Sequence, residues 1–368
     1  MTEAKQPPSP DPKTTLRSVH TKSFPGILER LRVSLVVSTY QAGKVIILRN
    51  DGGALNTHFR SFQKPMGIAA DGARLTIGGS NTVWHYRNMP AVAPKLEPKG
   101  KHDACYLPRS IHVTGDIDIH ELAWSGRGEL WLVNTRFSSL CTLDEDHSFV
   151  PRWRPPFVTA LSPEDRCHLN GLEMEDGEPA WVTCHGATDA TAGWRDGKAH
   201  GGVLLDVRTG ETLLRDLSMP HSPRKHGGRL WVLESGEGSL SIVDPAQRTC
   251  TSRAQFPGFT RGLAFVGPVA FVGLSKVRES AVFSGIPLVD RVEERICGIW
   301  AVNVESGEIL GFVRFEAGVE EIFAVQVLPS RFPEVLEWGD PRMNDSYVVP
   351  DAALADVPKP PPDDTTSS

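Results

Sequence analysis

The chain has 368 residues and a formal net charge of −6; 40% of its residues are hydrophobic and 23% are charged. It has no basic block of the kind that nucleic-acid binding needs, and no apolar run approaches the roughly 18 residues of a membrane span, so we expect neither a nucleic-acid nor a membrane partner. Length alone suggests about two domains at ~150 residues each, but single closed all-β folds often exceed that size.

The two ends of the chain are rich in Pro, Ser, Thr and Asp and poor in large apolar side chains. We expect residues 1–22 and 350–368 to be disordered tails, because they cannot bury enough surface to offset the entropy of ordering. The first residues lack the apolar stretch of a secretion signal. The six cysteines are scattered without a C-x-x-C pair, which favours reduced thiols and a cytoplasmic protein.

Between the tails, in residues 23–349, short apolar runs alternate with turns. The stretch "RVSLVVSTYQAGKVIILRN" predicts two strands around a turn at 41–43, and Asp71-Gly72 marks a hairpin. The later runs "ELWLVNT", "PAWVTCH", "RLWVLES" and "VAFVGLS" are also typical of strands, because β-branched and aromatic side chains fill a pleated, half-buried surface. Segments 90–115 and 276–295 look like insertions.

These runs recur as a repeat of about 40–60 residues, close to the length of a four-stranded propeller blade. The last apolar segment, "VEEIFAVQVLP", lacks a second strand after it, whereas "VSLVVST" near the start lacks a first strand before it. Joined, they make one complete repeat, which would remove the exposed sheet edge. The sequence therefore predicts an all-β, six-bladed β-propeller closed by N- and C-terminal strands in one blade. Five or seven blades are the alternatives.

One position of the repeat is polar in five of the six units. It lies just before the first strand of each blade, which lines the central channel, so its side chains should meet at one mouth. The residues are Met66, His120, Asn170, His221, Arg261 and Glu320. His168 precedes Asn170 by two residues and should face the same way in a strand of period two.

A second set of mostly hydroxyl residues ends the second strand of each blade. Its members are Thr39, Ser80, Thr135, His185, Ser235 and Ser275. Hydroxyls at strand ends commonly satisfy neighbouring backbone groups, so this set favours a structural role. His185 replaces a hydroxyl near the same mouth.

Three interpretations of the mouth remain open. Imidazoles with a carboxylate and an amide oxygen suit a divalent ion such as Zn, Mn or Fe, which predicts a metal site. Its ligands would be His120, His168, Asn170, His221 and Glu320. Arg261 favours a bound anion instead, because a guanidinium pairs with carboxylate or phosphate, and both hold if an anionic substrate sits on the metal. The third interpretation is a polar ring that holds only water.

Several long motifs resemble a bacterial conserved-hypothetical β-propeller family without a settled activity. They include "FVPRWRPPFVTALSPEDRCHLNGL", "LSMPHSPR" and "GFTRGLAFVGPVAFVGLS", and the resemblance covers about residues 34–332. More distantly, "LNGLEM" resembles the Asn-Gly turn of senescence-marker/gluconolactonase and strictosidine-synthase-like propellers. That likeness implies Asn170 as a metal ligand, with Glu320 or Glu321 as the acidic one. The lactonases use mostly oxygen ligands, whereas this chain offers several imidazoles.

Two functions of different class follow from these patterns. The first is an enzyme of hydrolase or lyase type that acts on a small anionic molecule. In it a divalent metal polarises a carbonyl or activates water, His168 or His185 moves a proton, and Arg261 orients the substrate. The second is a non-catalytic propeller that binds a small ligand or a protein partner. No H-E-x-x-H, P-loop or G-x-S-x-G motif supports a more specific activity.

Overall fold

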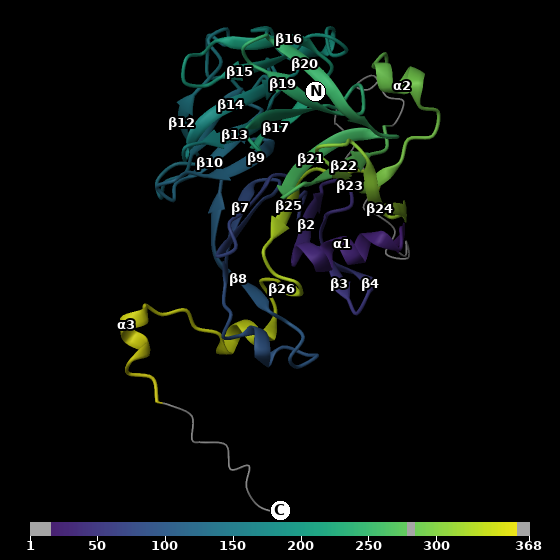
Figure 1. Ribbon diagram of the computed structural model, residues 1–368. Coiled ribbons are helices and arrows are strands. Elements are labelled where there is room, and N and C mark those ends of the chain that lie inside the picture. The colour runs from purple at the N-terminus through teal and green to yellow at the C-terminus, as the bar shows by residue number, and fades with distance from the viewer. Residues whose placement is uncertain (1–15, 278–283, 359–368) are drawn as a thin grey trace, which may run out of the picture.

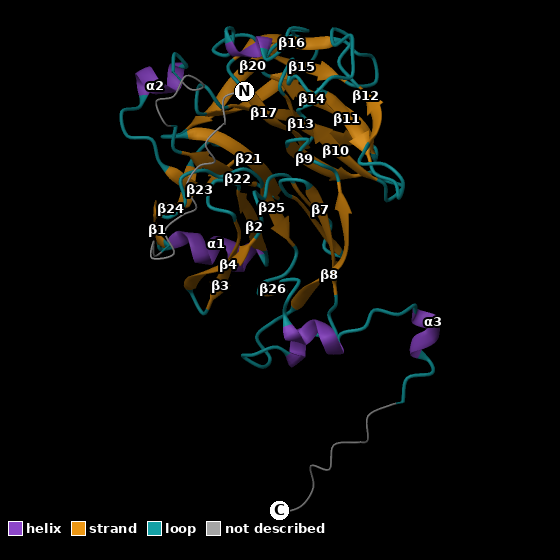
Figure 2. Ribbon diagram, turned by 180° about the vertical axis from the view of Figure 1, so that it is seen from behind, coloured by secondary structure: helices purple, strands orange, loops and turns teal. Residues whose placement is uncertain are grey.

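Six antiparallel sheets surround a central axis in the computed structural model, which describes residues 16–277 and 284–358 (Figures 1 and 2). The innermost strand of each sheet contacts the innermost strand of the next sheet, and contact between the strands of 325–328 and 68–70 closes the ring. The protein is therefore a six-bladed β-propeller, which confirms the predicted fold class.

The four strands of each blade run outward from the axis in chain order, except that the innermost strand of blade one comes from the C-terminal part of the chain. Blade one contains β25 (Val325–Leu328), β2 (Ser34–Thr39), β3 (Lys44–Asp51) and β4 (Ala54–Ser61); blade two contains β5 (Ile68–Ala70), β6 (Arg74–Gly78), β7 (Thr82–Asn88) and β8 (Ala104–Val113). Blade three contains β9 (Ile119–Trp124), β10 (Leu130–Asn134), β11 (Ser139–Thr142) and β12 (Val150–Trp153); blade four contains β13 (Leu169–Glu175), β14 (Glu178–Cys184), β15 (Gly202–Asp206) and β16 (Thr212–Leu217). Blade five contains β17 (Pro220–His226), β18 (Arg229–Glu234), β19 (Ser239–Asp244) and β20 (Thr249–Gln255); blade six contains β21 (Phe259–Val266), β22 (Val269–Ser275), β23 (Cys297–Asn303) and β24 (Ile309–Ala317).

The second strands are buried along almost their whole length, because neighbouring blades cover both of their faces. All residues of β2, β10 and β22 are buried, whereas the outer strand β24 alternates between buried and partly exposed positions. This double coverage explains why the sequence shows continuous apolar runs at these strands.

All six cysteines are free thiols, and five of them are buried.

The inner strands approach each other too closely for a side chain at some positions. A Cβ on Gly171 would lie 2.4 Å from the Pro223 side chain of the next blade, and one on Gly262 would lie 2.7 Å from the backbone nitrogen of Val325. The recurrent Gly-Leu or Gly-Ile step at the start of the inner strands therefore reflects the narrow centre of the ring.

The two chain ends close the ring in one blade, as predicted. β25 pairs with β2 in antiparallel register, with Leu35 opposite Val327 and Val37 opposite Val325. The chain also reinforces blade six, where β1 (Arg17–His20) pairs with β24 and α1 (Ser23–Leu31) packs Phe24 against Phe271. The expected tail of residues 1–22 is thus wrong for 17–21, whose backbone pairs with β24; residues 1–15 lie outside the described part of the chain.

The C-terminal segment reinforces the opposite neighbour, blade two. β26 (Pro333–Val335) pairs in parallel with β8 at the outer edge of this blade. β8 itself falls within the insertion expected at 90–115, so part of that segment is the fourth strand of blade two. The insertion expected at 276–295 contains α2 (Pro287–Arg291), while 278–283 are not described. α3 (Asp351–Leu354), in the expected C-terminal tail, stands apart from the ring in both ribbon views (Figures 1 and 2). None of the helices in the described ranges is long and apolar enough to span a membrane.

Hydroxyl groups link successive blades at the end of the second strands. The side-chain oxygens donate to backbone carbonyls of the next blade in four cases: Ser38 to Met66, Thr135 to Leu169 (2.6 Å), Ser235 to Thr260 (2.5 Å) and Ser275 to Ile322 (3.0 Å). This confirms the structural role predicted for Thr135, Ser235 and Ser275. In blade one the linking hydroxyl belongs to Ser38 rather than Thr39.

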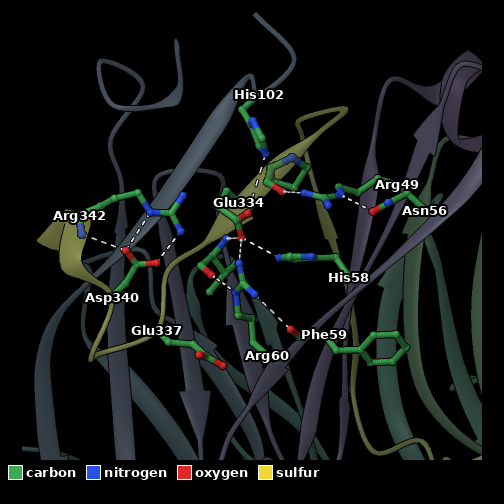
Figure 3. Close-up of polar contacts among 12 residues, drawn as sticks. Arg49, Asn56, His58, Phe59, Arg60, His102, Glu334, Glu337, Asp340 and Arg342 are labelled. Atoms are coloured by element: carbon green, nitrogen blue, oxygen red, sulfur yellow. Dashed lines mark hydrogen bonds and ion pairs between the residues drawn. The ribbon is translucent and has the colours of Figure 1, made fainter. Parts of the chain in front are cut away.

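A buried carboxylate fastens the C-terminal segment between blades one and two (Figure 3). Glu334 accepts hydrogen bonds from His58 Nε2 (2.9 Å) and Arg60 Nη2 (2.6 Å), and Arg49 donates to the carbonyl of Pro333 (2.6 Å). Burial acts to raise the pKa of Glu334, but the hydrogen bond from His58 and the charges of His58 and Arg60 outweigh it and lower the pKa to about 2.

We expect Glu334→Gln to destabilise the protein in a pH-dependent way. Because the folded pKa lies below the usual 4.5, the carboxylate contributes stability above pH 4.5, and this is lost as the pH falls toward 2. The variant should lose about 2–3 kcal/mol of unfolding free energy at pH 7 and much less at pH 3, measured by urea denaturation. Glu337→Gln, at an exposed position in the same segment, is the control and should be nearly silent. An equal loss at both pH values would show that packing, not charge, holds the segment.

Candidate functional site

A cavity of about 260 Å³ lies at one mouth of the central channel, and all six blades contribute to its wall. The lining residues are Tyr40, Lys64, Met66, Asp118, His120, His168, His185, Trp194, Met219, His221, Phe259, Arg261 and Phe323. Five of the predicted site residues are therefore brought together: His120, His168, His185, His221 and Arg261. The structure does not test their roles, which stay predictions.

Two predicted residues, Asn170 and Glu320, do not line the cavity. The Asn170 side chain is buried, and its Oδ1 accepts a hydrogen bond from Thr183 Oγ1 of the adjacent strand (2.7 Å). Glu320 lies before the first strand of blade one, where its carbonyl accepts the Lys276 N–H (2.8 Å).

Phe323 holds the position in blade one that was expected for Glu320. Its backbone N–H donates to the carbonyl of Ser38 on the neighbouring strand (2.8 Å), and its ring faces the cavity. The alignment was wrong by three residues, because Phe323-Ala324-Val325, and not the acidic pair before it, matches Arg261-Gly262-Leu263.

Four imidazoles form a continuous row along the cavity wall. The ring centroids of His120 and His168 are 4.8 Å apart, those of His168 and His185 are 4.4 Å apart, and those of His185 and His221 are 4.8 Å apart. Trp194 lies on the 3-10 turn Gly193–Arg195, and its ring centroid is 4.4 Å from that of His168 and 5.1 Å from that of His185. The row therefore joins blades three, four and five across the mouth.

Backbone carbonyls set the tautomers of two of these histidines. His120 Nδ1 lies 2.9 Å from the carbonyl oxygen of Asp118, and His221 Nδ1 lies 3.0 Å from that of Met219. Since a carbonyl only accepts, Nδ1 carries the proton in both rings and Nε2 keeps a lone pair. Asp118 and Met219 each adopt a positive φ, 55° and 45°, so the same local turn presents both rings.

Burial keeps three histidines of the row neutral at pH 7. It lowers the pKa of His120, His185 and His221 well below 6.5, and the charge of Arg261 adds to the effect. Within the described chain, both ring nitrogens of His185 are buried without a hydrogen-bond partner. His168 Nδ1 lies 3.0 Å from the Asp165 carboxylate, which also accepts a hydrogen bond from Trp194 Nε1 (3.0 Å).

Arg261 brings a cation to the cavity, where the charges of Asp118 and Glu321 act on it. Its guanidinium lies 3.5 Å from the centre of the Phe323 ring, and its Nη2 is buried with no hydrogen-bond partner in the described ranges. Burial lowers the pKa of Arg261 from its usual value, but an arginine stays protonated at neutral pH. The acid nearest the rim, Asp118, is already paired with Lys64 (3.1 Å).

The donor geometry does not favour the predicted metal site. Over residues 16–277 and 284–358, no group of three or more His, Cys, Asp or Glu side chains is arranged to hold a metal ion. The imidazoles pack ring against ring, with His168 and His185 only 26° from parallel, and His168 Nδ1 is engaged by Asp165. The metal stays a prediction that only the metal content of the purified protein can test.

Sequence reasoning missed several wall residues that obey a simple rule. Lys64, Asp118, Met219 and Phe259 each precede a predicted mouth residue by two positions and line the cavity with it. The period-two argument that identified His168 applies equally to them. Tyr40 and Trp194 lie in connections, where the repeat carries no signal.

A buried charged layer closes the channel beneath the cavity. Arg224 of blade five pairs with Glu121 of blade three (3.0 Å) and donates to the carbonyls of Leu172 (3.2 Å) and Leu263 (3.1 Å) in blades four and six. Glu173 lies near this pair and accepts the Lys225 N–H (2.7 Å). Burial raises the pKa of Glu173 to about 7, although the charge of Arg224 opposes the shift.

The fold and the cavity define a six-bladed propeller with a polar pocket at one mouth of its channel. The chain belongs to the family described as "Domain of unknown function (DUF4915)", whose model matches residues 22–336. This confirms the expected membership in a propeller family of unknown function.

Solved structures support the fold alone. A chain of the nidogen/laminin complex shares 10% sequence identity, with a TM-score of 0.51 and coverage of 81% of this chain and 99% of that one. A protein of unknown function from Bacteroides caccae shares 9% identity, with the same TM-score and the same coverage. No curated protein matches the sequence. The distant likeness to lactonases stays a prediction.

The neutral histidines should make stability depend on pH. A group whose folded pKa lies below 6.5 costs stability as the pH falls below 6.5, because only the unfolded chain then takes up the proton. We expect the melting temperature to drop between pH 7 and pH 5 and His185→Phe, which keeps the ring stacking, to make this drop smaller. His200→Phe, at an exposed site, is the control for the substitution itself. An unchanged slope in His185→Phe would contradict the prediction.

The raised pKa of Glu173 should make the protein less stable at high pH. Because the folded pKa of Glu173 is about 7, ionisation costs stability as the pH rises from 4.5 to 7. Glu173→Gln should therefore match the wild type near pH 4 and be more stable by about 2–3 kcal/mol at pH 8, measured by urea denaturation. Glu175→Gln should instead lose stability at pH 8, because Lys225 and Arg208 lower the pKa of Glu175 despite its burial. A Glu173→Gln variant that is less stable at pH 8 would show that Glu173 ionises without cost.

Proposed function

We propose that the protein binds a small organic anion in the cavity at the channel mouth. The observation that carries this proposal is the Arg261 guanidinium, whose Nη2 is buried without a partner. A desolvated cation costs free energy unless a counter-charge or hydrogen-bond acceptors compensate it. A carboxylate or phosphate group of a ligand would supply both, in the bidentate geometry that arginine favours.

The other wall residues define what accompanies the anionic group. His120 and His221 offer Nε2 lone pairs, which accept hydrogen bonds from hydroxyl or amino groups. Phe259, Phe323 and Met66 supply apolar surface. The volume of about 260 Å³ lies just below the roughly 300–1,000 Å³ typical of small-molecule pockets, so a compact hydroxy acid or small phosphorylated molecule suits its size and chemistry.

A second candidate is an enzyme that acts on such an anion, of the hydrolase or lyase type expected from the sequence. The observation that favours it is the contact of His168 with Asp165, in which a carboxylate orients an imidazole beside the neutral ring of His185. A histidine that is oriented by a carboxylate, as His168 is by Asp165, can move a proton to or from a substrate held by Arg261.

The central test replaces the guanidinium. Wild type and Arg261→Met would be titrated with malate, gluconate, citrate and inorganic phosphate by calorimetry. We expect at least one anion to bind the wild type and Arg261→Met to bind it at least about tenfold more weakly, because a charge-assisted contact is lost. Without ligand, Arg261→Met should melt at an equal or higher temperature, since it removes a buried charge whose Nη2 has no hydrogen-bond partner in the described ranges.

Arg127→Met is the matched control, because Arg127 is 86% exposed and does not line the cavity. It should bind the anion as the wild type does. Undiminished binding by Arg261→Met would contradict the proposal. If no anion binds and the purified protein carries one divalent ion that His120→Ala with His221→Ala removes, the metal hypothesis would replace it.

A further inference from the structure

A second cavity, of about 210 Å³, lies where blades one and two meet the C-terminal segment, and it shares no residue with the central cavity. Four aromatic side chains contribute to its wall: Phe62, Trp84, Tyr86 and Trp338. The remaining lining residues are Ser61, Gln63, Asn81, Thr82 and Glu337. None of these lining residues carries a positive charge.

The aromatic rings form the sides of a box. Phe62 and Trp84 have centroids 6.1 Å apart and planes at 88°, Phe62 and Tyr86 are 6.3 Å apart at 60°, and Trp84 and Trp338 are 6.1 Å apart at 66°. These steeply inclined contacts hold the rings around the cavity, and all four of them line it. Because the face of an aromatic ring carries negative potential, such a box attracts a cation that lies within about 6 Å of the ring centres.

One wall is a large side chain that the fold leaves open to solvent. Trp338 is 61% exposed, although it lies only three residues after the end of strand β26. Its neighbour Glu337 accepts the Ser61 N–H (2.9 Å), which holds this segment against blade one. The hydrogen bonds of Glu334 fix the segment three residues before Glu337. Trp338 is thus positioned beside Trp84 without being buried by it.

The carboxylate of Glu337 accepts a backbone hydrogen bond from Ser61 but has no cation beside it in the described ranges. In Figure 3 Glu337 lies apart from the Glu334 cluster, and no dashed line joins it to Arg60 or Arg342. Those two arginines are engaged by Glu334 (2.6 Å) and by Asp340, whose Oδ1 accepts from Arg342 Nε (2.8 Å). The cavity therefore combines aromatic faces with one carboxylate that has no cationic partner in the described structure.

We propose that this cavity binds a methylated ammonium group, either of a free small cation or of a methylated lysine on a protein. The methyl groups match the aromatic faces, because they spread the positive charge over an apolar surface and lower the cost of leaving water. An unmethylated ammonium needs hydrogen-bond acceptors around it, and the rings offer few. Glu337 supplies the counter-charge.

The test uses choline and its neutral isostere 3,3-dimethylbutan-1-ol, titrated into the full chain by calorimetry. Choline should bind at least about tenfold more tightly than the isostere, because only choline carries the charge. Trp338→Ala and Glu337→Gln should each weaken choline binding about tenfold, with melting temperatures unchanged because both side chains are exposed. Arg261→Met should bind choline normally, so a failure of the central anion site would be recognised separately.

A second arm distinguishes the two sources of the group. A short peptide that contains trimethyllysine is compared with the same peptide containing lysine; tighter binding of the methylated peptide than of choline would identify a protein partner, and the reverse a small cation. Equal binding of choline and its isostere would overturn the proposal, as would binding of a neutral sugar such as glucose in place of choline. A wild type that binds neither choline nor the methylated peptide would also overturn it.

Discussion

The antiparallel pairing of β25 with β2 is the constraint on which both the ring and its central cavity depend. It places Phe323, from the C-terminal part of the chain, beside Tyr40, from the N-terminal part, so that blade one completes the cavity wall. Two further attachments flank this blade: β1 on blade six and β26 on blade two. A ring held at three places keeps the inner strands in fixed register, which is what brings residues from six blades to one mouth.

At the channel mouth, one of the hydroxyl groups that would link neighbouring blades is replaced by a histidine. Ser235 and Ser275 end their strands by bonding to the next blade, but in blade four the corresponding residue is His185, whose ring nitrogens have no partner in the described chain. A stabilising contact is therefore replaced by a buried imidazole, close to a buried guanidinium on Arg261. Such costs concentrated in one cavity are typical of a site whose ligand completes the missing contacts.

The sequence predicts the fold well because both faces of the second strands are buried, which produces apolar runs that recur blade after blade. The mouth histidines are predictable for the same reason, since a repeat places equivalent residues at equivalent points around the axis. Asn170 does not line the cavity as predicted, because its side chain bonds to Thr183 on the adjacent strand, and the repeat pattern does not specify such a local partner. Glu320 was predicted at the mouth because the acidic pair at 320–321 was matched to the polar position of the repeat, which Phe323 occupies in the structure. Trp194 depends on the path of a connection, and that path is not encoded in the repeat.

The two proposed sites are linked by one connection, between β4 and β5. Phe62 and Gln63 line the aromatic cavity, and Lys64 and Met66 line the central one. Backbone hydrogen bonds hold this connection at three points: Phe62 N–H to Gly43 (3.1 Å), Ser80 N–H to the Gln63 carbonyl (3.0 Å) and Met66 N–H to Gly78 (2.8 Å). A ligand in one cavity could influence the other only by moving this segment. Because neighbouring strands fix it along its length, the connection is more rigid than an open loop, and the two cavities should fill independently of each other.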